Sequence, residues 1–275
     1  MNARRQPQTY IIYALLILFT LVAVLPFIGI VLLSFKDTSE LGNGAFSLPQ
    51  TLRWENYTEA WEGANFGNYF QNSVIVVIPA VLIALVLSLM SGYAFGTMRF
   101  RGENALLLLI LLGLMVPFEA VIIPLWQLLG SLHLRNTYWG LILPQVALSF
   151  AFGTFWMRAH FKGMPSDLID AAVVDGCGSW GVLWRVLLPI STPALLSLVV
   201  LLFMWTWNEF LLVLVVAGGD LRTLPVGLAL LRGRYSTDIT VMAAGATMVS
   251  LPVIIVYIIF QRQFIRGLVS GAVKG

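Results

Sequence analysis

Long apolar runs separated by short polar stretches dominate this sequence. Six of the runs are long enough to cross a hydrocarbon core of about 30 Å as helices, because a helix rises about 1.5 Å per residue. They cover residues 10–35, 70–97, 105–129, 137–158, 187–217 and 240–261. The pattern therefore predicts an all-α integral membrane protein with six transmembrane helices.

The third run is the least regular, since Pro117, Glu119 and Pro124 interrupt it. Proline removes a backbone hydrogen-bond donor and kinks a helix. A kinked helix is the simplest expectation, and a pair of shorter re-entrant segments is the alternative. Because the composition does not shift along the chain, we expect residues 1–275 to form a single membrane domain.

Composition agrees with a bilayer location and excludes several functions. The chain is 59% hydrophobic and 11% charged, whereas a soluble domain carries about 25% charged residues. The one cysteine, Cys177, cannot form an internal disulfide, and His133 and His160 do not build a metal site with it. No basic face suits nucleic acid, and no catalytic constellation is visible. We expect a protein that is not an enzyme and holds no metal.

The placement of Lys and Arg predicts the orientation, because cytoplasmic loops carry an excess of these residues. An N-terminus in the cytoplasm places Arg4, Arg5, Arg99, Arg101, Arg158, Lys162, Arg185, Arg262, Arg266 and Lys274 inside, and Lys36, Arg53, Arg135, Arg222, Arg232 and Arg234 outside. The bias predicts that both termini are cytoplasmic, together with the loop after the fourth run.

That loop contains the most specific stretch of the chain, DAAVVDGCGSWGVLWRVLLP at residues 170–189. Pro165 and Ser166 suit the first turn of a helix, and Gly176 suits its end. Residues spaced i, i+3, i+4 and i+7 share one narrow face of that helix, namely Leu168, Ala171, Ala172 and Asp175. Ser179 would cap a second short helix that stops at Pro189.

This stretch resembles the cytoplasmic loop of ABC importer membrane subunits, whose pattern is E-A-A, three residues, Gly, nine residues, then Ile-x-Leu-Pro. The matching positions are Asp170, Ala171, Ala172, Gly176, Val186, Leu188 and Pro189, with Asp in place of Glu and Val in place of Ile. The resemblance implies that residues 165–189 form the coupling-helix loop, which docks on an ATP-hydrolysing subunit. The alternative is an amphipathic helix that lies on the membrane surface or packs internally.

Two further segments carry a resemblance. Gly92 and Gly96 form a G-x-x-x-G pair that allows close helix approach, and the surrounding segment resembles one of sugar-type ABC permeases, although Gly96 and Thr97 replace its Ala-Arg pair. The tail at residues 261–275, ending in GAVKG, is similar to that of maltose-type permeases.

The family resemblance implies a type I ABC importer permease fold in a prokaryotic cytoplasmic membrane. It also implies four kinds of partner: a second permease subunit, two ATPase subunits that bind ATP and Mg, an extracytoplasmic solute-binding protein, and the lipid bilayer. None of the lysines, Lys36, Lys162 and Lys274, precedes Ser or Thr, so the chain has no P-loop. ATP hydrolysis therefore belongs to another chain, and no cofactor is expected here.

An ionisable residue inside a membrane segment is a functional candidate, because it is costly to place there. We expect Trp205, Asn208, Glu209 and Leu212 to share a helical face. An aromatic ring beside amide and carboxylate groups suits a hydroxyl-rich solute. Alternatively, Glu209 is a structural residue bonded to a neighbouring helix or subunit. Glu119 is a weaker candidate in the third run.

Two loops on the predicted outer side have alternative interpretations. Trp54, Tyr57 and Trp61 suit a short helix at the membrane interface, and contact with a docked soluble protein is the alternative. In the loop at residues 218–238, glycines suit the same kind of contact, although turn chemistry explains them more economically.

The sequence thus predicts the membrane subunit of an ATP-driven importer that moves a sugar by alternating access. An ABC permease for glycerol phosphate or another non-sugar solute is one alternative. An ion-coupled secondary transporter is the other, and it would need more membrane carboxylates than Glu119 and Glu209 provide.

Overall fold

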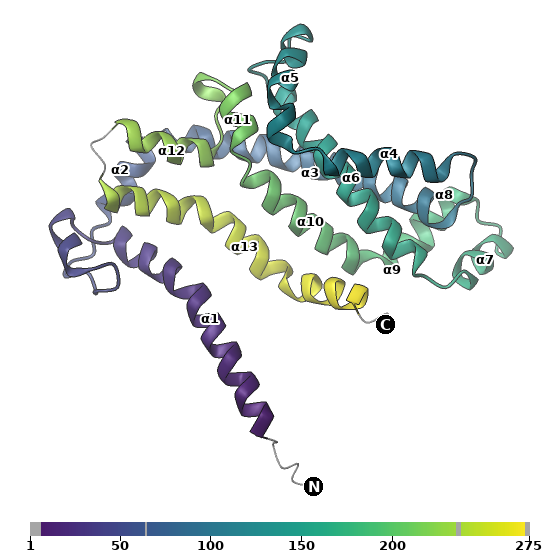
Figure 1. Ribbon diagram of the computed structural model, residues 1–275, viewed down its shortest axis with the longest axis horizontal. Coiled ribbons are helices and arrows are strands. Elements are labelled where there is room, and N and C mark those ends of the chain that lie inside the picture. The colour runs from purple at the N-terminus through teal and green to yellow at the C-terminus, as the bar shows by residue number, and fades with distance from the viewer. Residues whose placement is uncertain (1–6, 64, 235–237, 273–275) are drawn as a thin grey trace. The chain divides into compact units, whose positions relative to one another are not determined.

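The computed structural model describes residues 7–63, 65–234 and 238–272, and every regular element in these ranges is a helix (Figure 1). The elements are α1 (Pro7–Ser34), η1 (Thr38–Asn43), α2 (Glu55–Gly63), α3 (Phe66–Thr97), α4 (Glu103–Met115), α5 (Phe118–Ser131), α6 (Tyr138–Lys162), α7 (Asp167–Val174), α8 (Ser179–Gly181), η2 (Val182–Leu187), α9 (Leu188–Ile190), α10 (Thr192–Trp207), α11 (Leu211–Val216), η3 (Gly219–Leu221), α12 (Leu224–Arg234) and α13 (Ile239–Ala272). Arg4, Arg5, Lys274 and the last residues of the predicted tail lie outside the described ranges. The all-α prediction is confirmed.

Four helices are individually long and apolar enough to cross a bilayer: α1 over Thr9–Ser34, α3, α6, and α13 over Ile239–Ile265. They coincide with the predicted spans at 10–35, 70–97, 137–158 and 240–261. The two remaining predicted spans are bent pairs of shorter helices. The described part of the chain therefore has four to six candidate spans, and six requires that each bent pair crosses as one unit.

The third predicted span is broken rather than kinked, so the expectation of a kinked helix at 105–129 is wrong. The α4 and α5 helices meet at an angle of 100°. Val116 between them is extended, with φ −79° and ψ 120°. A residue before proline is driven out of the helical region by contact with the ring, and Pro117 follows. The arrangement matches the alternative of two shorter segments.

The fifth predicted span, 187–217, is interrupted twice. A bend of 79° separates the helical stretch Ser179–Ile190 from α10. Proline lacks the N–H that would continue the preceding helix but suits a first turn, and α10 has a proline, Pro193, in its first turn. The helix then ends at Trp207, and α11 begins at Leu211.

The described residues cluster into two compact units, each built from separate parts of the chain. Unit 1 takes residues 1–67 and 227–251, and unit 2 takes residues 68–226 and 252–275. The expectation of one membrane domain stays a prediction.

In unit 1, Asp238 directly precedes α13 and joins it to η1. Its carboxylate accepts hydrogen bonds from the Thr240 N–H at 2.9 Å and from the Thr38 hydroxyl at 3.0 Å. Burial raises the pKa of the Asp238 carboxyl, but the hydrogen bonds from Thr240, Thr38 and Val241 outweigh it and leave that pKa below its ordinary value.

Unit 2 is held together by a close approach of α3 and α6. A Cβ added at Gly92 would lie 2.3 Å from Met157 Cβ, and one added at Gly96 would lie 2.8 Å from Phe161 Cβ. Next to the Gly92 contact, Ser91 and Thr154 share a 2.7 Å hydrogen bond. The prediction that the G-x-x-x-G pair permits close helix contact is confirmed.

The opposite side of α6 packs on α10. The Trp156 indole donates to the Ala194 carbonyl at 3.1 Å, and the rings of Phe152 and Trp205 meet edge to face with centroids 4.7 Å apart. At one end of unit 2, α5 and α11 lie next to each other, and α7 lies at the other end (Figure 1). Because α6 runs between these two ends of unit 2, it fixes the positions of the two candidate sites described below relative to each other.

Replacement of Gly92 by Ala tests the α3–α6 contact. We expect Gly92→Ala to lower the stability of the subunit by about 1–3 kcal/mol, because the added methyl meets the Met157 backbone. Thermal denaturation in detergent, followed by size-exclusion chromatography, measures the change. Gly113→Ala is the matched control, since no atom lies within 4 Å of its added Cβ. Equal melting temperatures for the two variants would contradict a tight interface.

Candidate functional site

The predicted coupling helix is α7, and Gly176 ends it as expected. Gly176 has φ +83°, and its N–H donates to the Val173 carbonyl at 3.0 Å. The next N–H, of Cys177, donates to the Ala172 carbonyl at 2.9 Å. These two bonds form a Schellman motif, in which a left-handed residue satisfies the last helical carbonyls. Glycine adopts this conformation without the steric cost that a Cβ imposes.

The face predicted from spacing is divided between the protein interior and its free surface. Ala172 is buried, whereas Leu168, Ala171 and Asp175 are exposed, and so is Asp170. Two apolar neighbours, Val173 and Val174, are also exposed, the latter to 87%. The free side of α7 thus combines apolar side chains with carboxylates.

Such a surface is unusual for a solvated loop, because exposed apolar patches mark interaction sites. The tryptophans of the second half of the loop extend it, since Trp180 and Trp184 are both exposed. This stretch of unit 2 therefore presents a surface suited to another protein.

The second half of the loop differs from the prediction at both ends. Gly178, in an extended conformation, precedes the helix, and Ser179 is already its first residue, so the predicted Ser179 cap is wrong. The helix also continues past Pro189 to Ile190. It does so through the π-helical turn η2, in which the Leu188 N–H reaches the Leu183 carbonyl. Pro189 has no N–H to continue the α-helical ladder, and a π turn is a common local accommodation.

This second half is anchored to the rest of unit 2. Val182, Leu183 and Leu187 are buried, and the Tyr93 hydroxyl of α3 donates to the Ser179 carbonyl at 3.2 Å. The exposed α7 is therefore attached to a fixed segment that leads directly into α10.

The residues proposed to line a solute path do not share a helical face, because the helix ends among them. Asn208 is the C-terminal cap of α10, and Glu209 lies in the break before α11. Leu212 is buried, whereas Trp205 and Asn208 are exposed. The prediction of one continuous face is wrong, since it assumed an unbroken helix.

The side chains around this break make local backbone contacts. Glu209 Oε1 accepts a hydrogen bond from the Leu212 N–H at 2.8 Å, and the Asn208 amide donates to the Met204 carbonyl at 2.8 Å. The first N–H groups of a helix have no partner within it, so the Glu209 carboxylate stabilises the start of α11. This geometry agrees with the structural interpretation of Glu209.

Glu119 is exposed in the first turn of α5, directly after the α4–α5 break. Among the described residues, no hydrogen bond joins it to Trp205, Asn208 or Glu209. The same part of the chain contains no group of three His, Cys, Asp or Glu side chains that could hold a metal ion.

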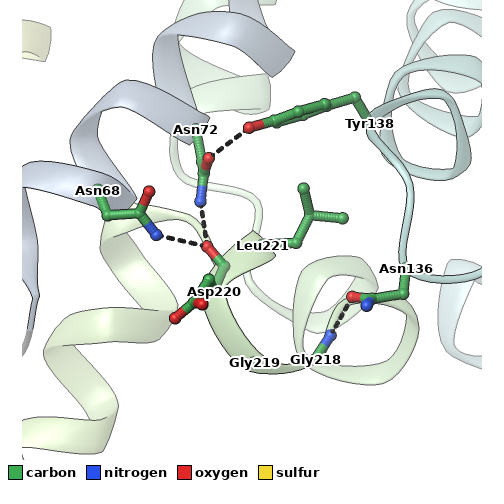
Figure 2. Close-up of a pocket in the computed structure, with 8 residues that line it drawn as sticks. All are labelled: Asn68, Asn72, Asn136, Tyr138, Gly218, Gly219, Asp220 and Leu221. Carbon is green, nitrogen blue, oxygen red and sulfur yellow. Dashed lines mark hydrogen bonds between the residues drawn. The ribbon is translucent and has the colours of Figure 1, made fainter.

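A polar cluster that the sequence analysis missed holds the segment after α11 (Figure 2). Asn72 donates from Nδ2 to the Asp220 carbonyl at 2.5 Å and accepts from the Tyr138 hydroxyl at 2.7 Å. The same Nδ2 donates to the Arg222 carbonyl at 2.9 Å. Asn68 also donates to the Asp220 carbonyl, at 2.7 Å. The spacing of Asn68 and Asn72, four residues apart at the start of an apolar helix, is the signal that could have identified the cluster.

The cluster borders a cavity of about 620 Å³. Asn136 closes one side, where its Oδ1 accepts from the Gly218 N–H at 2.9 Å (Figure 2). Gly219 has φ +58°, so the predicted turn chemistry of these glycines is confirmed. Three amide side chains and a phenol thus fix the position of a turn that carries the Asp220 carboxylate.

Asn72 and Asn68 provide a matched test of this cluster. We expect Asn72→Ala to cost about 1–3 kcal/mol, because it removes three hydrogen bonds, two to the carbonyls of Asp220 and Arg222 and one from the Tyr138 hydroxyl. Asn72 is 2% exposed, whereas Asn68 is half-buried and makes one such bond. Asn68→Ala should therefore cost distinctly less. Thermal denaturation and proteolysis at residues 216–224 measure both effects, and a larger loss in Asn68→Ala would contradict the assignment.

The role of Glu209 as a helix cap is tested by removing its negative charge and its hydrogen-bond acceptor in separate variants. Glu209→Gln keeps an acceptor oxygen for the Leu212 N–H, so we expect stability close to that of the original protein. Glu209→Ala removes the acceptor and should cost about 1 kcal/mol, as loss of a helix cap does. Thermal denaturation in detergent separates the two. Equal destabilisation by both variants would show that the charge, and not the cap, is what matters.

Comparison with protein families gives one match over most of the chain. The family described as binding-protein-dependent transport system inner membrane component matches residues 84–269. The matched region begins within α3 and includes the whole of the 165–189 loop and the break at Asn208.

Individual relatives are similar over nearly their full length. The chain is 39% identical over 259 residues to the arabinooligosaccharides transport system permease protein of Halalkalibacterium halodurans, covering 92% of each chain. It is 36% identical to the diacetylchitobiose uptake system permease protein of Streptomyces coelicolor, covering 95% of this chain and 88% of that protein. It is 32% identical to the trehalose transport system permease protein of Mycobacterium tuberculosis, covering both chains completely.

Solved structures show the same architecture. A chain of a bacterial ABC transporter involved in the import of the acidic polysaccharide alginate superimposes with a TM-score of 0.77 at 26% identity, covering 96% of this chain and 99% of that one. A second chain comes from a bacterial alginate ABC transporter in complex with alginate pentasaccharide-bound periplasmic protein, with a TM-score of 0.65. At 13% identity, covering 92% of this chain and 93% of that one, the second likeness concerns the fold alone.

Proposed function

Because this chain belongs to the family of binding-protein-dependent transport system inner membrane components, we propose that it is the permease subunit of an ATP-driven importer for an oligosaccharide. The observation that carries the proposal is the 165–189 loop. It combines the family's sequence signature with an exposed helix that ends in a Schellman motif at Gly176. Family membership favours this class over an ion-coupled secondary transporter.

The choice of solute class is supported by the relatives, which are described as permeases for arabinooligosaccharides, diacetylchitobiose and trehalose. All three names denote neutral or amide-bearing saccharides with many hydroxyl groups. We therefore favour an oligosaccharide over glycerol phosphate. The exposed Trp205 and Asn208 at the α10–α11 break supply a ring and an amide suited to such a solute.

The coupling of transport to ATP is assigned to α7. A separate ATPase subunit, which binds ATP and Mg, would cover Leu168, Val173 and Val174 with apolar contacts and face the carboxylates of Asp170 and Asp175. The anchored segment behind α7 would transmit its movement into α10, because Tyr93 and three buried residues hold that segment to unit 2. Movement of this kind drives alternating access, since each ATP state favours one arrangement of the helices.

The remaining partners follow from the same proposal. A second permease subunit completes the pathway, a second ATPase pairs with the first, and an extracytoplasmic binding protein delivers the solute. The charge bias of the loops supports cytoplasmic termini, which places the turn at Gly218 to Leu221 on the outer side. The Asn72 cluster gives that turn a fixed position for contact with the delivering protein.

Docking on α7 is tested by Gly176→Val and Asp170→Lys. We expect both variants to insert into the membrane and to reduce sugar uptake about tenfold or more, since losing about 1.4 kcal/mol of docking energy has that effect on an equilibrium constant. Valine at φ +83° strains the end of α7, and lysine reverses the charge of its free surface. Uptake of labelled sugar into cells, normalised to subunit abundance, gives the readout.

Gly178→Ala is the control for these variants. Gly178 has φ −73°, and no atom lies within 4 Å of an added Cβ. Its uptake should remain normal. Purification of the tagged subunit in mild detergent, followed by mass spectrometry, identifies the partners in each variant. Normal uptake and normal ATPase recovery in Gly176→Val and Asp170→Lys would reject the docking proposal.

A further inference from the structure

The 36–54 loop, defined here as residues 36–54 between α1 and α2, is closed at its base. The Arg53 N–H donates to the Phe35 carbonyl at 2.9 Å, which brings the two ends of the loop together. The buried Asn56 amide donates to the carbonyls of Ser34 and Lys36, both at 2.9 Å. These bonds attach the loop firmly to the last turn of α1.

The interior of the loop is polar. Lys36 is fully buried, and its Nζ donates to the Gly44 carbonyl at 2.6 Å and to the Ser47 hydroxyl at 2.7 Å. Glu40 is also buried, and its Oε2 accepts from the Gln50 N–H at 2.9 Å. Two backbone groups of the loop, the Gly44 carbonyl and the Gln50 N–H, are thus satisfied by buried side chains. Internal partners of this kind are required where irregular backbone lies in an apolar medium.

The outer surface of the same loop is apolar. The side chains of Phe46, Leu48, Leu52 and Trp54 are exposed to 59, 79, 59 and 62%, respectively. A loop in water normally has the opposite arrangement, because burial of apolar groups and exposure of charges are both favourable. The charges of this loop gather at its base, where Asp37 pairs with Arg53. The hydrogen bond from the Ser39 N–H, with further help from Arg53, lowers the pKa of the Asp37 carboxyl.

The loop folds back along α1. The Phe46 ring lies against Gly29, where an added Cβ would be 3.2 Å from Phe46 Cε1. Gly29 is consequently buried, although only 6% of the most apolar window of α1 is buried. Gly29 precedes Ser34, the end of the candidate span, by five residues, so Phe46 lies about 7.5 Å below the end of the helix.

We propose that the 36–54 loop inserts into the lipid leaflet at the C-terminal end of α1, with Phe46 and Leu48 among the upper acyl chains. The depth of about 7.5 Å agrees with the roughly 5–10 Å to which interfacial apolar groups enter the boundary between headgroups and acyl chains. Lipid is the occupant that fits, because Phe46 lies against Gly29, which is inside the candidate membrane span of α1. The aromatic cluster of Phe35, Trp54 and Tyr57 marks the interface above it. This lipid contact is independent of the solute and of the ATPases.

Site-directed spin labelling measures the depth directly. Single-cysteine versions, Phe46→Cys and Leu48→Cys, are made in a Cys177→Ser background, labelled, and reconstituted as the assembled transporter in phosphatidylcholine nanodiscs. Leu48→Cys removes no packing contact that would threaten folding, since Leu48 is 79% exposed. Glu55→Cys on α2 is the matched control, because Glu55 is an exposed carboxylate.

Collision with dissolved oxygen and with a water-soluble nickel chelate reports the surroundings of each label. We expect the oxygen-to-nickel accessibility ratio at positions 46 and 48 to be several-fold higher than at position 55. A ratio equal to that at position 55 would mean that the loop lies in water. Low accessibility to both reagents would mean that a protein partner covers it. Either result would overturn the proposal, while ATP hydrolysis by the assembled transporter in the same nanodiscs reports separately on its function.

Discussion

The close approach of α3 and α6 is the constraint on which unit 2 depends. Lipid tails are as apolar as the helices, so helix association in a membrane relies on packing and hydrogen bonds rather than on the hydrophobic effect. Gly92 and Gly96 let the α6 backbone come near, and the Ser91–Thr154 hydrogen bond joins the two helices where they meet. The opposite side of α6 packs on α10. The positions of the coupling loop and of the α10–α11 break therefore both depend on where the α3–α6 contact holds α6.

Breaks in the helices are the second organising feature. Val116 and Pro117 separate α4 from α5, and Asn208 to Phe210 separate α10 from α11. Each break leaves backbone N–H and C=O groups without a helical partner, and hydrocarbon offers them no hydrogen bond. Side chains supply some of the missing partners, as Glu209 does at the start of α11. Glu209, first considered for solute contact, therefore also stabilises a non-helical segment within a membrane protein.

Polar side chains serve the same purpose outside the helices. Asn72 holds the turn after α11 through two backbone carbonyls, and Lys36 supports the 36–54 loop through the Gly44 carbonyl. In both places a buried donor fixes an irregular segment, so that the exposed residues of that segment are presented in a defined way. The charged and amide residues of this chain are few, and those described here act mainly on the backbone.

The sequence by itself determined the helical class, the four unbroken spans, the close G-x-x-x-G contact and the end of the coupling helix at Gly176. Each of these follows from a local rule: the length of an apolar run, the absence of a Cβ, or a left-handed backbone. Only the tertiary structure decided which side of α7 is free and which groups Asn72, Glu209 and Lys36 bind. Those outcomes depend on hydrogen-bond partners from 3 to 150 residues away along the chain. Sequence periodicity cannot predict such contacts, because it indicates only which residues share a face of one assumed helix.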